Sequence, residues 1–184
     1  TTASGIYSHA EGINAVASGL YSHAEGQDTI ASGEGSHAEG DLTRASGISS
    51  HAEGDSTVAS GYASHTQGQS VSATANYAHA EGSSSIASGI ASHAEGNGTR
   101  ATANHSHAEG QGTCATAEST HTEGFYTSAT NAFAHAEGEN TLASQQAAHA
   151  EVEDTVASGQ VSHAQGSRSV ASSFAAHAEG EDTV

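Results

Sequence analysis

The chain has 184 residues with three Lys and Arg, 21 Asp and Glu, and a formal net charge of −18. A chain this acidic lacks the cations that nucleic acids and anionic lipids attract, so we expect no nucleic-acid partner. No apolar run approaches the about 20 residues of a membrane span, so we expect no direct membrane insertion in this segment. The single cysteine, Cys114, excludes an intrachain disulfide.

The motif Ser-His-Ala-Glu-Gly organises the chain and returns every 14 residues in one register. A fixed short period is typical of repeat architectures. Each repeat, for example residues 22–35, has two halves of the form small-x-Ala-x-Gly followed by two variable residues. Because small residues alternate, each half is predicted to be a strand of about five residues and a two-residue corner. We therefore predict an all-β, single repeat array over residues 1–184, with about thirteen 14-residue coils. Both ends of the sequence fall inside the repeat, so we expect a fragment of a longer fibre.

Side-chain volume predicts which residues of a coil point inward. A coil with two short sides has room only for small side chains. In residues 22–35 the inward set is predicted to be Ser22, Ala24, Gly26, Thr29, Ala31 and Gly33. The outward set is then His23 and Glu25 on one strand, and Ile30 and Ser32 on the other. A Thr ladder that points inward argues against ice binding.

Along the chain the pattern is cleanest over residues 1–70, where only the corners vary freely, as exposed loops do. Over residues 71–150 the second strand loosens, and Gln145 replaces its closing glycine. Gln145 is too large for the interior, so we expect that corner to bulge or turn outward. The glycine of the first strand is replaced only by Val152, which indicates a position that needs positive φ or close backbone approach. Val152 is therefore predicted to be a local fault, and the pattern recovers over residues 153–184.

The period Ser-x-Ala-x-Gly-x-x-Thr-x-Ala-x-Gly resembles the head repeats of trimeric autotransporter adhesins, the YadA-like (Hep/Hag) family, over essentially the whole chain. The resemblance implies a left-handed parallel β-roll, or β-solenoid, with three chains side by side as a homotrimer. It also implies an extracellular or cell-surface head that binds a host surface or matrix protein. Similar repeats occur in phage tail fibres, which would place the chain in a virion tail fibre. The family often has Ser-Val-Ala-Ile-Gly where this chain has Ser-His-Ala-Glu-Gly, so its trimer core cannot be copied over directly.

Stacked coils place like residues about 4.8 Å apart, so each outward position forms a ladder. The histidine ladder comprises His9, His23, His37, His51, His65, His79, His93, His107, His121, His135, His149, His163 and His177. The accompanying acidic ladder comprises Glu11, Glu25, Glu39, Glu53, Glu81, Glu95, Glu109, Glu123, Glu137, Glu151 and Glu179, with Gln67 and Gln165 at the other two sites.

Three interpretations of these ladders remain open. The first is a hydrogen-bonded His–Glu ladder at a subunit interface, which the exchange of Glu for Gln favours. The second is metal binding, since three chains would place three imidazoles in a ring, and His with carboxylate suits zinc, nickel, copper or iron. The His ladder is the only candidate for a metal, and rings about 4.8 Å apart argue against full occupancy. The third is a solvated display of His and Glu.

An apolar ladder marks the other strand. It comprises Val16, Ile30, Val58, Ile86, Leu142, Val156, Val170 and Val184, with Cys114 also on it, and it is interrupted by Arg44, Ser72, Arg100 and Ser128. An apolar stripe on a polar surface is normally covered, here by another subunit. We expect one ladder at the threefold axis and favour the His–Glu ladder because it is stricter. The alternative places the apolar ladder at the axis.

No enzymatic activity is expected. Ser8 and His9 are adjacent on a strand and point to opposite faces, so they cannot form a catalytic triad. The zinc-deaminase signature needs Pro-Cys-x-x-Cys, and the chain has no Pro and one Cys. We therefore interpret the chain as a structural or adhesive segment of a trimeric surface fibre. The alternatives are a metal-binding His-ladder fibre and a phage tail-fibre shaft.

Overall fold

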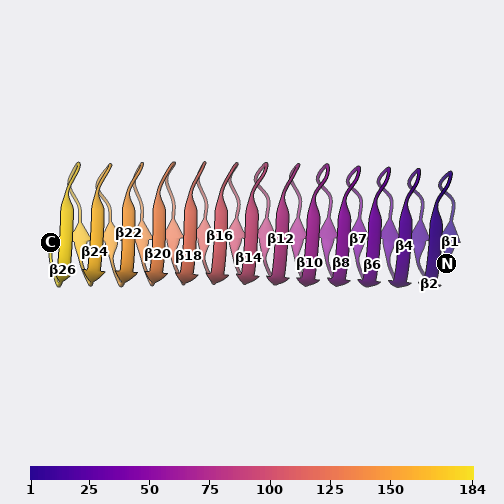
Figure 1. Cartoon of the computed structure of the whole chain (residues 1–184), viewed down its shortest axis with the longest axis horizontal. Coiled ribbons are helices and arrows are strands. Elements are labelled where there is room, and N and C mark those ends of the chain that lie inside the picture. Colours follow the sequence, from indigo (N-terminus) through magenta and orange to yellow (C-terminus); the bar gives the residue numbers. More distant parts are fainter. The chain divides into compact units, whose positions relative to one another are not determined.

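The computed structural model describes residues 1–184 and contains two compact units, residues 1–91 (unit 1) and residues 92–184 (unit 2). Both units repeat one coil, which has a five-residue strand, a two-residue strand and two corners. Within each unit, Figure 1 shows the long strands as wide arrows that lie parallel to one another, with the short strands behind them. None of the chain's elements is a helix able to span a membrane.

Unit 1 contains strands β1 to β13. Its long strands are β2 (His9–Ile13), β4 (His23–Gln27), β6 (His37–Asp41), β8 (His51–Asp55), β10 (His65–Gln69) and β12 (His79–Ser83). Its short strands are β1 (Thr2–Ala3), β3 (Val16–Ala17), β5 (Ile30–Ala31), β7 (Arg44–Ala45), β9 (Val58–Ala59), β11 (Ser72–Ala73) and β13 (Ile86–Ala87).

Unit 2 contains strands β14 to β26. Its long strands are β14 (His93–Asn97), β16 (His107–Gln111), β18 (His121–Phe125), β20 (His135–Glu139), β22 (His149–Glu153), β24 (His163–Ser167) and β26 (His177–Glu181). Its short strands are β15 (Arg100–Ala101), β17 (Cys114–Ala115), β19 (Ser128–Ala129), β21 (Leu142–Ala143), β23 (Val156–Ala157) and β25 (Val170–Ala171).

Within each unit the long strands form one parallel sheet and the short strands form another. The pairing joins residues 14 apart, as for His37 with His51 in unit 1 and His107 with His121 in unit 2. Like residues therefore stack on like residues. The prediction of an all-β, parallel β-solenoid with 14-residue coils is confirmed.

The core of each unit consists of small side chains between the two sheets. Ala24 of the long strand and Ala31 of the short strand have no exposed surface, and Thr29 is equally buried. The buried Ser22 hydroxyl donates a hydrogen bond of 2.7 Å to the carbonyl of Gly19, which satisfies the hydroxyl and closes the corner. The predicted inward set is right for Ser22, Ala24, Thr29, Ala31 and Gly33. A core this narrow buries little apolar area in each coil.

Two expectations about the coil are wrong. The second strand has two residues rather than five, because the N–H groups of Ser32 and Gly33 both donate to the carbonyl of Ala45, at 2.9 and 3.4 Å. Two donors on one acceptor end the regular ladder, and the chain turns there. Gly26 was predicted to point inward but is exposed. It lies where the long strand bends at a positive φ.

The conformational requirement predicted for the first-strand glycine is confirmed. Gly40 has φ +111°, and a Cβ built there would lie 2.0 Å from the carbonyl oxygen of Gly54. Val152 holds the same position with φ 89°, so it is a β-branched residue in a backbone region that suits glycine. It is the local fault that the sequence predicts.

The corners vary in side chain but not in backbone. Their second residue has a positive φ, for example Tyr21 at 56° and Asp28 at 53°. The N–H of each donates to a carbonyl in the preceding coil, Tyr21 to Ile6 at 3.0 Å and Asp28 to Ile13 at 2.8 Å. The expectation of free variation therefore holds only for side chains. Gln145 is exposed at its corner, as expected.

Candidate functional site

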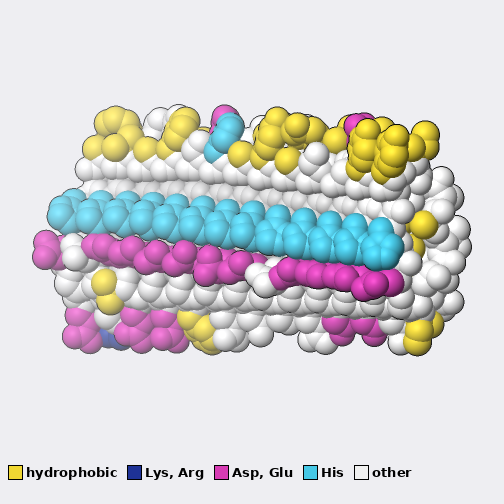
Figure 2. Space-filling view, turned by 45° about the vertical axis from the view of Figure 1, so that its right-hand side comes forward, with side chains coloured by type: hydrophobic (Ala, Val, Ile, Leu, Met, Phe, Trp, Pro, Cys, Tyr) yellow, Lys and Arg dark blue, Asp and Glu magenta, His cyan; other side chains and the backbone are white.

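The histidine–glutamate face is the outward surface of the long strands. Each long strand begins at its histidine, alternation points the following Ala into the core, and Glu returns to the surface. In Figure 2 the His side chains form a stripe with a parallel stripe of Glu beside it. The structure therefore brings the predicted His and Glu ladders together on one surface within each unit.

The imidazole rings of neighbouring coils are stacked. In unit 1 the centroids of His23 and His37 lie 4.7 Å apart with an interplanar angle of 5°. In unit 2 the centroids of His107 and His121 lie 4.8 Å apart with an angle of 1°. The parallel in-register pairing fixes this spacing, which is the distance between neighbouring strands.

Ten of the thirteen ladder histidines lie within 4.0 Å of the Glu two residues later on their own strand. The distance between Nε2 and the nearer carboxylate oxygen runs from 3.5 Å at His107 and Glu109 to 4.0 Å at His177 and Glu179. Some carboxylates also approach the histidine of the next coil, as Glu151 does at 3.2 Å from His163. Most of these contacts are longer than a good hydrogen bond, so the pairs attract one another by charge only where the imidazole is protonated.

Burial keeps several of these imidazoles neutral. The pKa values of His51, His65, His135 and His149 are lowered by burial first and by the neighbouring histidines second. Buried Nε2 atoms that make no hydrogen bond within the chain include those of His23, His37, His51, His65, His107, His121, His135 and His149. A neutral imidazole with a free ring nitrogen is the form that accepts a hydrogen bond or ligates a metal.

Three of the carboxylates show how crowded the acidic ladder is. Burial, followed by contact with Glu151 and repulsion from Glu123, raises the pKa of Glu137. Burial also acts to raise the pKa of Glu151, but contacts with Glu137 and with His163 outweigh it and lower that pKa. Neighbouring carboxylates thus differ in how readily they take a proton.

A groove runs beside the Glu ladder in unit 1, where the following glycines have no side chains. It is lined by Glu11, Gly12, Glu25, Gly26, Glu39, Gly40, Glu53, Gly54 and Gln67. The groove is acidic along its length and therefore suits cationic rather than anionic groups.

The apolar ladder lies on the short strands. Val16, Ile30 and Val58 are half-buried, while Arg44 stands between them in register and is exposed. In unit 2 Cys114 is a free, half-buried thiol on the same ladder, and Arg100 is exposed beside it. This ladder is therefore broken by charge, whereas the histidine ladder is not.

The sequence reasoning missed a row of apolar side chains at the corner that follows each short strand. Its exposed members include Ile6, Tyr7, Tyr21, Ile48, Tyr62, Tyr77 and Ile90 in unit 1. The rings of Tyr7 and Tyr21 stack with centroids 5.3 Å apart. Figure 2 shows hydrophobic side chains gathered along one edge of the molecule. Aligning the corner residues of successive repeats would have revealed this row.

The geometry offers no serine nucleophile. Ser22 is buried and its hydroxyl is committed to the Gly19 carbonyl, while the imidazole of His23 lies on the outer surface. The same arrangement recurs at Ser36 and His37. The expectation that adjacent Ser and His point to opposite faces is confirmed.

A parallel β-solenoid with repeated surface ladders defines the chain as a repeat protein. The sequence model of the YadA head domain repeat matches this chain in two copies, over residues 1–22, 24–41 and 45–69. Over these residues the chain is similar to YadA head repeats, the kind that form the heads of trimeric autotransporter adhesins. A search of curated proteins finds no match.

Proposed function

We propose that the chain is an adhesive segment of an extracellular, cell-surface fibre, and that three copies lie side by side as a homotrimer. The observation that carries the proposal is a YadA-type head repeat whose long strands present an unbroken ladder of His in each unit, with Glu beside it except at Gln67 and Gln165. The narrow Ala and Thr core supports association, because one chain buries little apolar area.

We place the histidine–glutamate face at the threefold axis. That face carries no Arg, whereas the apolar ladder exposes Arg44 and Arg100, which would be costly to bury without partners. At the axis, the Nε2 atoms without a hydrogen bond in the chain would find hydrogen-bond partners on neighbouring chains. The apolar corner row then stays on the outside, where Tyr and Ile are suited to contact a host surface or matrix protein.

Light scattering after size exclusion at neutral pH tests the assembly. The expected mass is about three times the 18.2 kDa of one chain, with and without a strong chelator. A mass of one chain under both conditions would contradict the proposal.

A pair of matched double variants tests which face lies at the axis. His23→Ala with His163→Ala should lower the trimer fraction, because both residues lie on the histidine–glutamate face. Val16→Ala with Val156→Ala, on the apolar ladder, should leave the trimer intact. The reverse result would place the apolar ladder at the axis.

Adhesion is tested separately from assembly. Beads that carry the trimer should be retained on a surface coated with extracellular matrix and not on one coated with albumin. Substituting Tyr7 and Tyr21 by Ser should weaken retention without changing the mass, since both side chains are exposed. Equal retention on both surfaces would leave the chain a spacer rather than an adhesive segment.

A further inference from the structure

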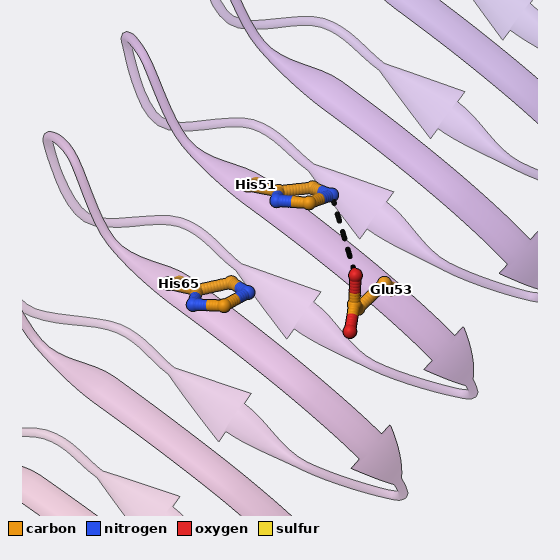
Figure 3. A group of neighbouring side chains, drawn as sticks. All are labelled: His51, Glu53 and His65. Carbon is orange, nitrogen blue, oxygen red and sulfur yellow. Dashed lines mark ion pairs between the residues drawn. The ribbon is translucent and has the colours of Figure 1, made fainter.

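The histidine–glutamate face contains groups of three side chains whose ligand atoms all lie within 4.8 Å of one another. In unit 1 these groups are His51, Glu53 and His65, and Glu25, His37 and Glu39. In unit 2 they are His93, Glu95 and His107; His107, Glu109 and His121; and His135, Glu137 and His149. Figure 3 shows the group of His51, Glu53 and His65. The imidazole of His51 is directed at the Glu53 carboxylate, and the ring of His65 lies nearly parallel to the ring of His51.

The spacing within one strand fits a metal ion of the zinc class. An ion with tetrahedral geometry and bonds of about 2.0–2.1 Å holds a nitrogen and an oxygen about 3.4 Å apart. Nε2 of His107 lies 3.5 Å from the Glu109 carboxylate, and Nε2 of His135 lies 3.5 Å from that of Glu137. These pairs therefore need almost no rearrangement to share an ion.

The second imidazole comes from the next coil. The rings of His107 and His121 are stacked at 4.8 Å, and those of His135 and His149 at 4.7 Å. The second ring must tilt toward the ion to reach bonding distance. The Nε2 atoms of these four histidines make no hydrogen bond in the chain, so the tilt breaks none.

The geometry points to binding of a borderline divalent cation, with Zn²⁺ as the type, by three ligands from adjacent coils. Four of the groups offer two imidazoles and one carboxylate, and the group of Glu25, His37 and Glu39 offers one imidazole and two carboxylates. A fourth position remains for water or for a side chain of another copy. The ligands belong to a single chain, so the inference goes beyond the proposed function and does not rest on it.

The groups overlap, and this limits how many ions the ladder can hold. Two groups of unit 2 share His107, so only one of them can be filled at a time. Together with the group around Glu137, unit 2 has room for two ions. The two groups of unit 1 share no residue and also allow two. Ions in neighbouring coils would in addition repel one another.

The overlap gives a matched pair of variants in unit 2. His107→Ala removes a ligand from both overlapping groups, whereas His121→Ala leaves the group of His93, Glu95 and His107 complete. Both changes delete one stacked ring, and both side chains are similarly exposed, at 35% and 38%. A purely structural role for the ladder would therefore make the two variants behave alike.

The experiment loads the full chain with Zn²⁺, removes excess ion by dialysis, and counts bound zinc per chain by elemental analysis. We expect up to four ions on the unmodified chain, one fewer on His107→Ala, and an unchanged number on His121→Ala. Equal counts for the two variants, or no retained zinc on the unmodified chain, would overturn the inference. Circular dichroism of both variants confirms that the counts refer to folded protein.

Two further measurements identify the ligands. Co²⁺ bound in place of Zn²⁺ should give the visible absorption of a four-coordinate site with nitrogen ligands, and its absence would contradict imidazole ligation. Excess Ca²⁺ should not displace the zinc, because Ca²⁺ prefers all-oxygen sites. Displacement would assign the ions to the carboxylates alone and overturn the proposal. Light scattering on the same samples reports the trimer independently, so failure of one proposal is distinguishable from failure of the other.

Discussion

In each coil the long strand pairs through five residues and carries His and then Glu or Gln at its outward positions, whereas the short strand pairs through two. The short strand's outward position accepts Val, Ile, Leu, Cys, Ser or Arg. Both strands share the same Ala-filled core. The core therefore does not explain why the residue type at the outward positions is nearly constant on the long-strand sheet and variable on the short-strand sheet. The difference lies in what each sheet does on its outer surface and in the backbone at its end.

The ends of the two strands differ in the backbone that they require. The long strand ends in a glycine with positive φ, such as Gly40, while the corresponding glycine of the short strand, such as Gly33, does not have a positive φ. A Cβ at either position would lie 2.0 Å from a backbone oxygen of the next coil. The short-strand position nevertheless carries Ala at Ala75, Ala103 and Ala117. Close approach alone is therefore accommodated in several coils, whereas close approach with positive φ is accommodated only at Val152.

The largest expected effect comes from Gly40→Ala compared with Gly33→Ala. The first should lower the free energy of unfolding by about 3 kcal/mol, since it adds backbone strain to a clash. The second should lower it by about 1.5 kcal/mol, since neighbouring coils can shift as they do around the natural alanines. Urea unfolding of both variants measures the difference. Equal losses would show that φ plays no part in the strictness of the long strand.

Acid should weaken the long-strand sheet before it affects the short-strand sheet. The folded-state pKa values of His51, His65, His135 and His149 lie below the unfolded value of about 6.5. Folding therefore favours the neutral rings, and stability is fully present above about pH 6.5 and falls as the pH drops from that value toward the folded pKa values. The lowered pKa of Glu151 acts in the same direction but only near its own lower range.

Thermal unfolding between pH 7.5 and pH 5 checks this prediction. We expect the melting temperature to be constant down to about pH 6.5 and to decrease below it. A variant with His51 and His135 replaced by Gln should show a flatter profile, because two of the titrating rings are gone. A profile of the same slope would assign the acid sensitivity to other groups.

The sequence predicts much of this architecture because the 14-residue period fixes both the coil and the register. Once His37 stacks on His51, the positions of every Glu and Ala follow from alternation. The special role of the first-strand glycine was also predictable, because Val152 alone replaces it.

Other features of the fold and of the candidate site could not be predicted from residue type. Tyr21 and Asp28 both adopt a positive φ because their N–H groups donate to carbonyl groups of the preceding coil. Neither residue type predicts such a backbone conformation. The short second strand arises from two donors on the Ala45 carbonyl, which no residue pattern encodes. The His–Glu–His groups depend on side-chain distances of a few tenths of an ångström, so the sequence could predict the ladder but not which members group together.

At Val152, the one residue that replaces the glycine of a long strand, we expect a substitution to change the free energy of unfolding less than Gly40→Ala does, and in the opposite direction. Val152→Gly should raise the free energy of unfolding by about 1 kcal/mol, because relief of strain outweighs the extra chain entropy of glycine. The Val152 side chain is 52% exposed, so little buried area is lost. Urea unfolding of Val152→Gly, alongside Gly40→Ala, measures this gain in the free energy of unfolding. A loss of stability would mean that the Val152 side chain makes a contact worth more than the strain it causes.

The smallest expected effect is that of Ser36→Ala, at the corner that joins the short strand to the long strand. The Ser36 hydroxyl donates to the Gly33 carbonyl at 2.7 Å, and its N–H reaches the same oxygen at 3.2 Å. The N–H bond survives the substitution, so we expect a loss of about 0.5–1 kcal/mol. Ala78 and Ala134 occupy the same position naturally, and their N–H groups make the equivalent bonds at 3.3 and 3.2 Å. A matched Ala134→Ser variant should gain a similar amount, and if neither variant changes the urea midpoint, the corner is held by its backbone alone.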